Sequence, residues 1–141
     1  MPALPEVTLA PVPPSESFVH VVSNPVPNEH VRLSTHAILM RSEEQCIAAV
    51  HVGVPVRQMR IGETTLTNPH ILRQGSKISK AYETSLFYPE RPPKLVHRFP
   101  PVTVRSETPE GETVETTYEG GEGHCVLHMM NQFQGRSIYD E

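Results

Sequence analysis

Fifteen prolines among 141 residues restrict this chain to short secondary-structure elements. Their share is about twice the usual ~5%, and each proline fixes φ and removes a backbone donor. Long uninterrupted helices are therefore excluded. Valine outnumbers leucine, 16 to 9, and β-branched side chains suit a strand better than a helix. We expect a mainly β protein with extended proline-rich segments and one or two short helices, forming a small irregular β-sandwich or a β-barrel-like body.

The length of the chain limits the number of domains, and its apolar runs indicate whether it crosses a membrane. A chain of this size suits one domain and can bury roughly two-thirds of the surface of its unfolded form. Residues 1–10 hold no Lys or Arg and no sustained apolar run, so we expect no signal peptide or transit peptide. The longest nearly apolar run, 46–56, is too short for a membrane span. We expect a soluble protein.

Two cysteines, Cys46 and Cys125, lie far apart in the sequence. They form neither a dense disulfide framework nor a CxxC pair, which favours the cytoplasm or another reducing compartment. A single bridge in an oxidising compartment is the alternative.

The net charge of −4 hides a segregated pattern. Residues 1–31 hold three Glu and no base, residues 32–105 hold eleven bases and five acids, and residues 106–141 hold one base and eight acids. The pattern favours neutralisation within the fold, or a basic face toward an acidic partner. Nucleic acid is an unlikely partner, because the sequence pI is near 6.0 whereas basic nucleic-acid domains exceed ~9.

Two proline-rich segments are suited to lying across other proteins. Residues 1–16 are expected to form an extended N-terminal arm, and residues 17–141 a single small β-rich domain crossed by the proline-rich segment 89–101. Stiff extended segments lose little entropy on binding. The residues expected to contact a partner are Pro11, Pro13, Pro14, Tyr88, Pro89, Arg91, Pro92, Pro93, Lys94, Arg98 and Phe99.

Local patterns predict a series of short elements. The clearest is a β-hairpin, 102–107 with 112–118, around the turn Thr108-Pro109-Glu110-Gly111. A capping box at 42–45 predicts a short helix near 43–51, with a strand at 46–56 as the alternative. For residues 124–133 a buried strand is favoured over a short helix. The remaining predictions are strands at 17–23, 34–40, 56–61, 64–67 and 85–88, and a helical turn at 69–74.

The sharpest chemical candidate is His124-Cys125-x-x-His128. Thiolate and imidazole suit Zn²⁺, and the two histidines at i and i+4 share a face of a helix or strand. A structural zinc site needs a further ligand, and the other candidates are distant in sequence. The common alternative is a buried cysteine beside ordinary histidines.

These observations favour a non-catalytic structural or adaptor subunit of a large assembly, whether cytoskeletal, organellar or virion-scale. Its partners would be other protein subunits, and we expect no cofactor, no catalysis and no membrane span, because no nucleophile, base and orienting group occur in a recognised pattern. The alternatives are a small zinc-binding or metal-dependent domain using His124, Cys125 and His128, and a virion decoration protein.

Overall fold

A computed structural model describes residues 16–140 of the chain. The strands in this range are β1 (Cys46–Ala48), β2 (Gln58–Ile61), β3 (Thr64–Gln74), β4 (Ser79–Glu83), β5 (Lys94–Arg98), β6 (Val102–Glu107) and β7 (Thr113–Tyr118). The helices are α1 (Glu29–Leu39) and α2 (Gly120–Phe133), with short 3-10 turns η1 (Glu16–Phe18), η2 (Ala49–Val52) and η3 (Ile138–Asp140).

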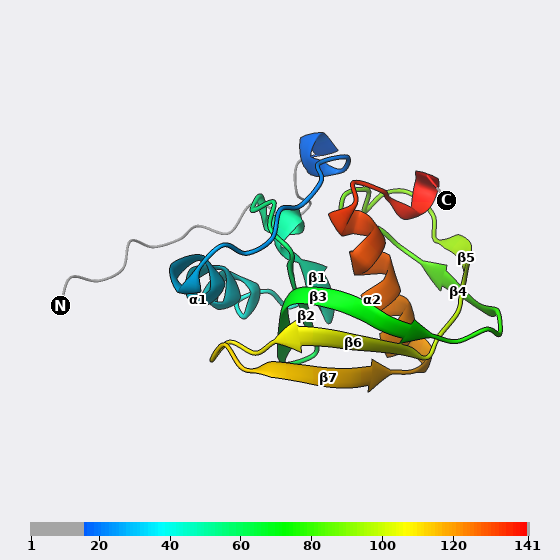
Figure 1. The fold of residues 1–141 in the computed structure, drawn as a ribbon. Coiled ribbons are helices and arrows are strands. Elements are labelled where there is room, and N and C mark those ends of the chain that lie inside the picture. The colour runs from blue at the N-terminus through cyan, green and yellow to red at the C-terminus, as the bar shows by residue number, and fades with distance from the viewer. Residues whose placement is uncertain (1–15, 141) are drawn as a thin grey trace.

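The strands form two sheets. Five antiparallel strands have the order β1-β2-β3-β6-β7, and β4 pairs with β5 in a separate two-stranded sheet. Helix α2 lies between the two sheets and contacts both, whereas α1 lies at the other side of the larger sheet (Figure 1). The expectation of a mainly β protein with two helices is confirmed. The described residues form no closed barrel.

The predicted hairpin is present, and the strands expected at 56–61 and 64–67 form a second one. Strands β2 and β3 pair around Gly62, whose φ of 57° is readily adopted by glycine. Strands β6 and β7 pair in the register Val104↔Thr116, and Gly111 closes their turn with φ 87°. Val102 and Val104 are fully buried, as the alternation of apolar residues required.

The N-terminal half corrects two predictions. Residues 34–40, expected as a strand, lie mainly in α1, because the Asn28 side chain accepts a hydrogen bond from the Val31 N–H at 2.9 Å and caps the helix. Residues 43–51 form no α-helix. The Ser42 hydroxyl accepts the Glu44 N–H instead, and the chain continues into β1 and η2, which ends at Gly53. Residues 17–23 form no strand.

The helical turn expected at 69–74 is replaced by a continuation of β3. Asn68 adopts φ 48° there, and its amide group exchanges hydrogen bonds with the main chain of Val26 at 2.7 and 3.2 Å. These contacts hold an irregularity in the β3–β6 register without ending the strand. The contact between Asn68 and Val26, which are distant in sequence, therefore outweighs the local preference for a helical turn.

The C-terminal half gives three further corrections. The proline-rich segment 89–101, expected as a connector, contains β5, which is confined to a two-stranded edge sheet as proline neighbours require. Residues 85–88 form a turn, with Phe87 buried. Residues 124–133, expected as a strand, belong to α2.

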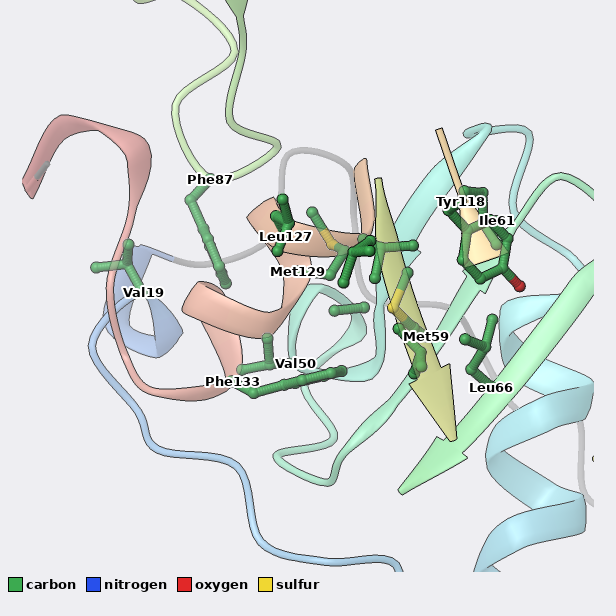
Figure 2. Packing of buried hydrophobic residues seen from close by; sticks show 14 residues of the cluster. Val19, Val50, Met59, Ile61, Leu66, Phe87, Tyr118, Leu127, Met129 and Phe133 are labelled. Atoms are coloured by element: carbon green, nitrogen blue, oxygen red, sulfur yellow. The ribbon is translucent and has the colours of Figure 1, made fainter. Parts of the chain in front are cut away.

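The main core lies between the larger sheet and one face of α2 (Figure 2). Val126, Met129 and Phe133 recur at helical spacing and are almost fully buried. Fully burying each such side chain contributes roughly 1.5–3 kcal/mol. This packing fixes the rotation of α2, so that His124 and His128 lie on a different face, toward β4.

The expected arm at 1–16 lies almost wholly outside the described residues. Among residues 16–140 no helix is long and apolar enough to cross a bilayer.

Candidate active site

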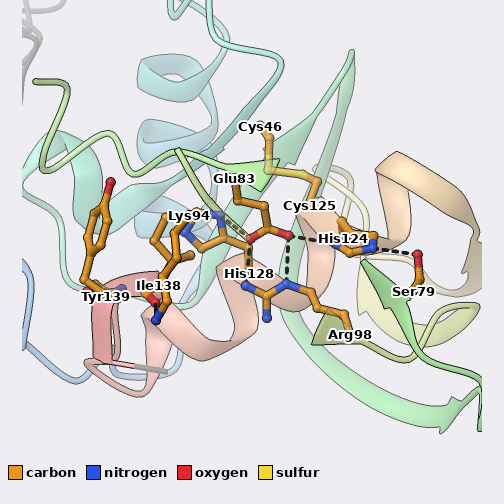
Figure 3. Close-up of polar contacts among 11 residues, drawn as sticks. Cys46, Ser79, Glu83, Lys94, Arg98, His124, Cys125, His128, Ile138 and Tyr139 are labelled. Carbon is orange, nitrogen blue, oxygen red and sulfur yellow. Dashed lines mark hydrogen bonds and ion pairs between the residues drawn. A yellow bond between two sulfur atoms is a disulfide. The ribbon is translucent and has the colours of Figure 1, made fainter. Parts of the chain in front are cut away.

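The carboxylate of Glu83, at the end of β4, is the centre of a buried polar cluster (Figure 3). Its Oε2 lies 2.8 Å from Nδ1 of His124 and accepts a hydrogen bond from Arg98 Nε at 2.9 Å. Its Oε1 accepts one from Arg98 Nη2 at 2.7 Å and lies 3.6 Å from Nδ1 of His128. One carboxylate thus faces two imidazoles and a bidentate guanidinium.

Strand and helix periodicities bring these groups together. Ser79 and Glu83 share one face of β4 because side chains alternate along a strand, and Arg98 on β5 stands opposite Ser79. His124 and His128, four residues apart, share one face of α2. The face of α2 that carries the two histidines lies against the face of β4 that carries Glu83.

Charge balance in the cluster fixes the ionisation of Glu83. Burial alone would raise its pKa, but the hydrogen bonds and charge of Arg98, with the hydrogen bond of His124, outweigh burial and lower the net pKa. Glu83 is therefore an ionised carboxylate that can only accept hydrogen bonds, so Nδ1 of His124 carries the proton between them. In the neutral ring the other nitrogen, Nε2, accepts from the hydroxyl of Ser79, 2.9 Å away.

His128 is held neutral. Burial lowers its pKa to about 4, and Glu83 only partly opposes this shift. The carboxylate at 3.6 Å favours a proton on Nδ1, which leaves a lone pair on Nε2. That Nε2 is buried and has no hydrogen-bond partner among the described residues.

His51 on η2 has the opposite tautomer. Its Nδ1 accepts the Ala48 N–H at 3.0 Å, and its ring packs on Phe87 with centroids 4.7 Å apart. Burial, followed by the charge of His128, lowers the pKa of His51 to about 3. A neutral ring that accepts at Nδ1 must carry its proton on Nε2, which is buried and likewise lacks a described partner.

His51 and His128 therefore form a complementary pair. His51 offers an unused N–H donor and His128 an unused lone pair. After burial, the charge of His128 is the next cause that lowers the pKa of His51. Unsatisfied buried polar atoms are rare and call for a water or a ligand. A small group that reaches these nitrogens can donate a hydrogen bond to His128 and accept one from His51.

A groove of about 460 Å³ passes over this cluster. One wall is the edge of β4 that pairs with no described strand, and the opposite wall is the loop that leads into β1. Its lining residues are Glu43, Glu44, Gln45, Cys46, Ala81, Tyr82, Glu83, Thr84, Leu86, Gly121, His124, Cys125, His128 and Met129.

Cys46 and Cys125 are joined in a disulfide, with Cα atoms 6.1 Å apart (Figure 3). The structure therefore contains a disulfide and not two free thiols at these positions. Both sulfur-bearing residues are half-buried and line the groove. Cys125 accordingly has no thiolate to offer a metal.

The expected ligand set of His124, Cys125 and His128 does not assemble. Residues 124–128 have the spacing of the zinc-binding H-E-x-x-H helix, with Cys125 in place of the glutamate that acts there as general base. The Nε2 of His124 faces Ser79, and the sulfur of Cys125 is bonded to Cys46. No group of three His, Cys, Asp or Glu side chains within residues 16–140 is arranged to hold a metal. These donors do not fit a zinc ion.

The residues expected to contact partners are dispersed. Pro11, Pro13 and Pro14 lie outside the described residues. The guanidinium of Arg91 lies 3.9 Å from the centre of the Tyr88 ring, in a surface cluster with Tyr139. Pro89, Pro92, Pro93 and Phe99 lie at or near the surface, and Lys94 donates to the Ile138 carbonyl at 2.7 Å. Arg98 instead belongs to the buried cluster.

Glu83 was not singled out from the sequence, and His51 was considered only, with Cys46 and His97, as a metal-ligand candidate distant in sequence. Both Glu83 and His51 are isolated titratable residues in an unremarkable context, and only folding places them beside α2. The spacing of His124 and His128 was the one local signal at this site, and it was interpreted as a possible zinc site.

The fold is that of solved peptide deformylases. The structure matches a class I type b peptide deformylase from Acinetobacter baumannii with a TM-score of 0.82 and 22% identity, over 96% of this chain and 100% of that one. The peptide deformylase of Thermotoga maritima gives 0.82 and 19%, over 96% and 98%. That of Legionella pneumophila gives 0.82 and 20%, over 94% and 85%. No curated protein matches the sequence.

The family model named Polypeptide deformylase matches residues 29–141, well over half of the chain. This match to an enzyme family overturns the expectation of a non-catalytic structural subunit whose partners are other subunits, and neither a virion protein nor a small zinc domain is supported. That expectation failed because proline content reports on element length and not on chemistry. The chain belongs to the polypeptide deformylase family.

Proposed function

We propose that this chain hydrolyses the formyl amide at the amino terminus of a polypeptide. Support comes from the family membership and from the unused imidazole nitrogens of His51 and His128, of which His128 lines the groove. A similar structure, of the Acinetobacter baumannii enzyme, holds Met-Ala-Ser. An extended peptide in this groove would lie along the free edge of β4, where main-chain groups are available for pairing.

The buried position of the two imidazoles limits what can react. His51 and His128 are only 2% and 7% exposed, so a small acyl group reaches them more readily than a bulky one. Formyl is the smallest acyl group, with a single hydrogen on its carbonyl carbon. The site is thus suited to formyl rather than to acetyl or larger groups.

The chemistry follows from the two tautomers. Nε2 of His128 accepts a proton from water as the water oxygen bonds to the formyl carbon, and Nε2–H of His51 donates to the carbonyl oxygen as it gains charge. The C–N bond then breaks, the amine nitrogen takes the proton back from His128, and formate leaves.

Glu83 and Arg98 position the base. The carboxylate faces Nδ1 of His128 and stabilises the imidazolium that forms, while Arg98 keeps that carboxylate ionised. A pKa of about 4 leaves His128 neutral near pH 7 but makes it a weak base, so we expect slow turnover.

Formate release from formyl-Met-Ala-Ser by the purified protein tests the proposal. We expect His128→Asn to lower kcat/KM by about 100-fold or more, the usual contribution of a general base. The matched control is His97→Asn, on an exposed position of β5. Acetyl-Met-Ala-Ser should not react. Absence of formate above the uncatalysed rate, or equal rates for H128N and H97N, would refute the proposal.

A further inference from the structure

The Cys46–Cys125 disulfide joins the two segments that carry the imidazole pair. Cys46 opens β1, which leads directly through Ala48 into η2 and His51, and Cys125 lies on α2 beside His124. The backbone N–H of Ala48 is the group that sets the tautomer of His51. The S–S bond is therefore a covalent link between the donor side and the acceptor side of the site.

The disulfide is also accessible. Both cysteines are half-buried and line the groove, and the bond between them is drawn in Figure 3. A thiolate that enters the groove can approach the bond without passing through the core. Exposure of this kind distinguishes exchangeable disulfides from purely structural ones.

Each joined segment has its own anchors. Arg60 donates to the carbonyls of Ser42 and Glu44, which hold the loop before Cys46, and β1 pairs with β2. Helix α2 is fixed by its apolar face and by Gln132, which donates to the Val19 carbonyl at 2.6 Å. Opening of the S–S bond therefore does not require unfolding, although it removes the bond between the two segments.

We propose that the Cys46–Cys125 disulfide is a thiol–disulfide exchange site for a dithiol reductant, and that its reduction alters the placement of His51 relative to His128. One thiolate of the reductant attacks a sulfur of the bridge, the S–S bond breaks, and the other cysteine leaves as a thiolate. The second thiol of the reductant then displaces the first cysteine. The dithiol becomes a disulfide, and two electrons and two protons pass to the protein. Any consequence for hydrolysis rests on the proposed function.

Two measurements on the full chain test this inference without substrate. Dithiothreitol followed by an alkylating reagent should label both cysteines while the far-UV circular dichroism stays native. Ring ¹⁵N signals of His51 and His128 should move on reduction, whereas that of the exposed His97 should not. Labelling only under denaturing conditions, or unchanged signals of His51 and His128 in fully reduced protein, would overturn it.

The variant Cys46→Ser/Cys125→Ser reproduces the reduced state, and its histidine signals should match those of reduced wild type. If this variant does not fold, the labelling of wild-type protein still decides the question. Failure of the proposed function has a different signature, since neither the oxidised nor the reduced chain would then release formate.

Discussion

Arg60 and Arg98 are both almost fully buried, at 6% and 5% exposure, yet they have different partners. Arg60 donates to four main-chain carbonyls, those of Leu39, Ser42, Glu44 and Gly62. Arg98 forms a bidentate pair with the Glu83 carboxylate. Arg60 thus holds main-chain carbonyls, which do not titrate. Arg98 keeps the Glu83 carboxylate ionised, and this carboxylate positions the rings of His124 and His128. Arg60 therefore holds the loop that lines the groove, and Arg98 determines the ionisation of Glu83 within it.

The largest expected effect is that of Arg60→Met. Four carbonyls lose their donor, and at roughly 1–3 kcal/mol for each group left unsatisfied we expect a loss of about 5 kcal/mol in unfolding free energy. Urea denaturation measures it. Arg60→Lys, which keeps the charge but not the planar fork, should recover only part. A loss below about 1 kcal/mol would show that solvent replaces these contacts.

Arg98→Met should cost about 3 kcal/mol, because it leaves the buried Glu83 carboxylate without its main partner. Here, unlike at Arg60, the loss should be repairable. The double variant Glu83→Gln/Arg98→Met should be more stable than R98M alone, since the unpaired charge is gone. A double-mutant cycle by urea denaturation gives the coupling, and additive losses would contradict the pairing.

Acid should destabilise the chain through the buried rings of His51 and His128, whereas the main-chain carbonyls that accept from Arg60 do not titrate. Burial lowers the pKa of His51 to about 3 and that of His128 to about 4, from 6.5. The unfolded chain therefore binds more protons below pH 6.5, and stability falls from there toward pH 3 to 4. Each histidine contributes up to about 1.4 kcal/mol per pH unit. His51→Gln should reduce the slope between pH 6 and 4 by about this amount, while His97→Asn should not. An unchanged slope in H51Q would show that His51 is not buried as a neutral ring.

The smallest effect is expected at an exposed arginine. Arg91 stacks on Tyr88 and Tyr139 at the surface, and such contacts contribute about 0.5–1 kcal/mol. Arg91→Ala should therefore change the thermal midpoint by only a few degrees. A loss as large as that of R98M would show that burial does not explain why Arg60 and Arg98 matter more than the exposed Arg91.

The sequence by itself determined those elements whose signals are local. The β6–β7 hairpin follows from alternating apolar residues around Pro109 and Gly111, and the β2–β3 hairpin from the turn at Gly62. The predominance of β structure followed from composition. These features depend on neighbours within a few residues, which the sequence displays directly.

Tertiary structure decided the remaining elements and the whole of the site. The capping box at Ser42 predicted a helix, but strand pairing of β1 with β2 prevailed, and α2 formed where a strand was favoured. The strand pairing of β4 with β5 brings Glu83 to Arg98, and the packing of α2 brings His124 and His128 to Glu83. Their protonation states arise from burial and from contacts between distant residues. His124, His128 and Arg98 were singled out from the sequence for other reasons, but only the folded chain adds Glu83 and His51 and gives all five their charges and their partners.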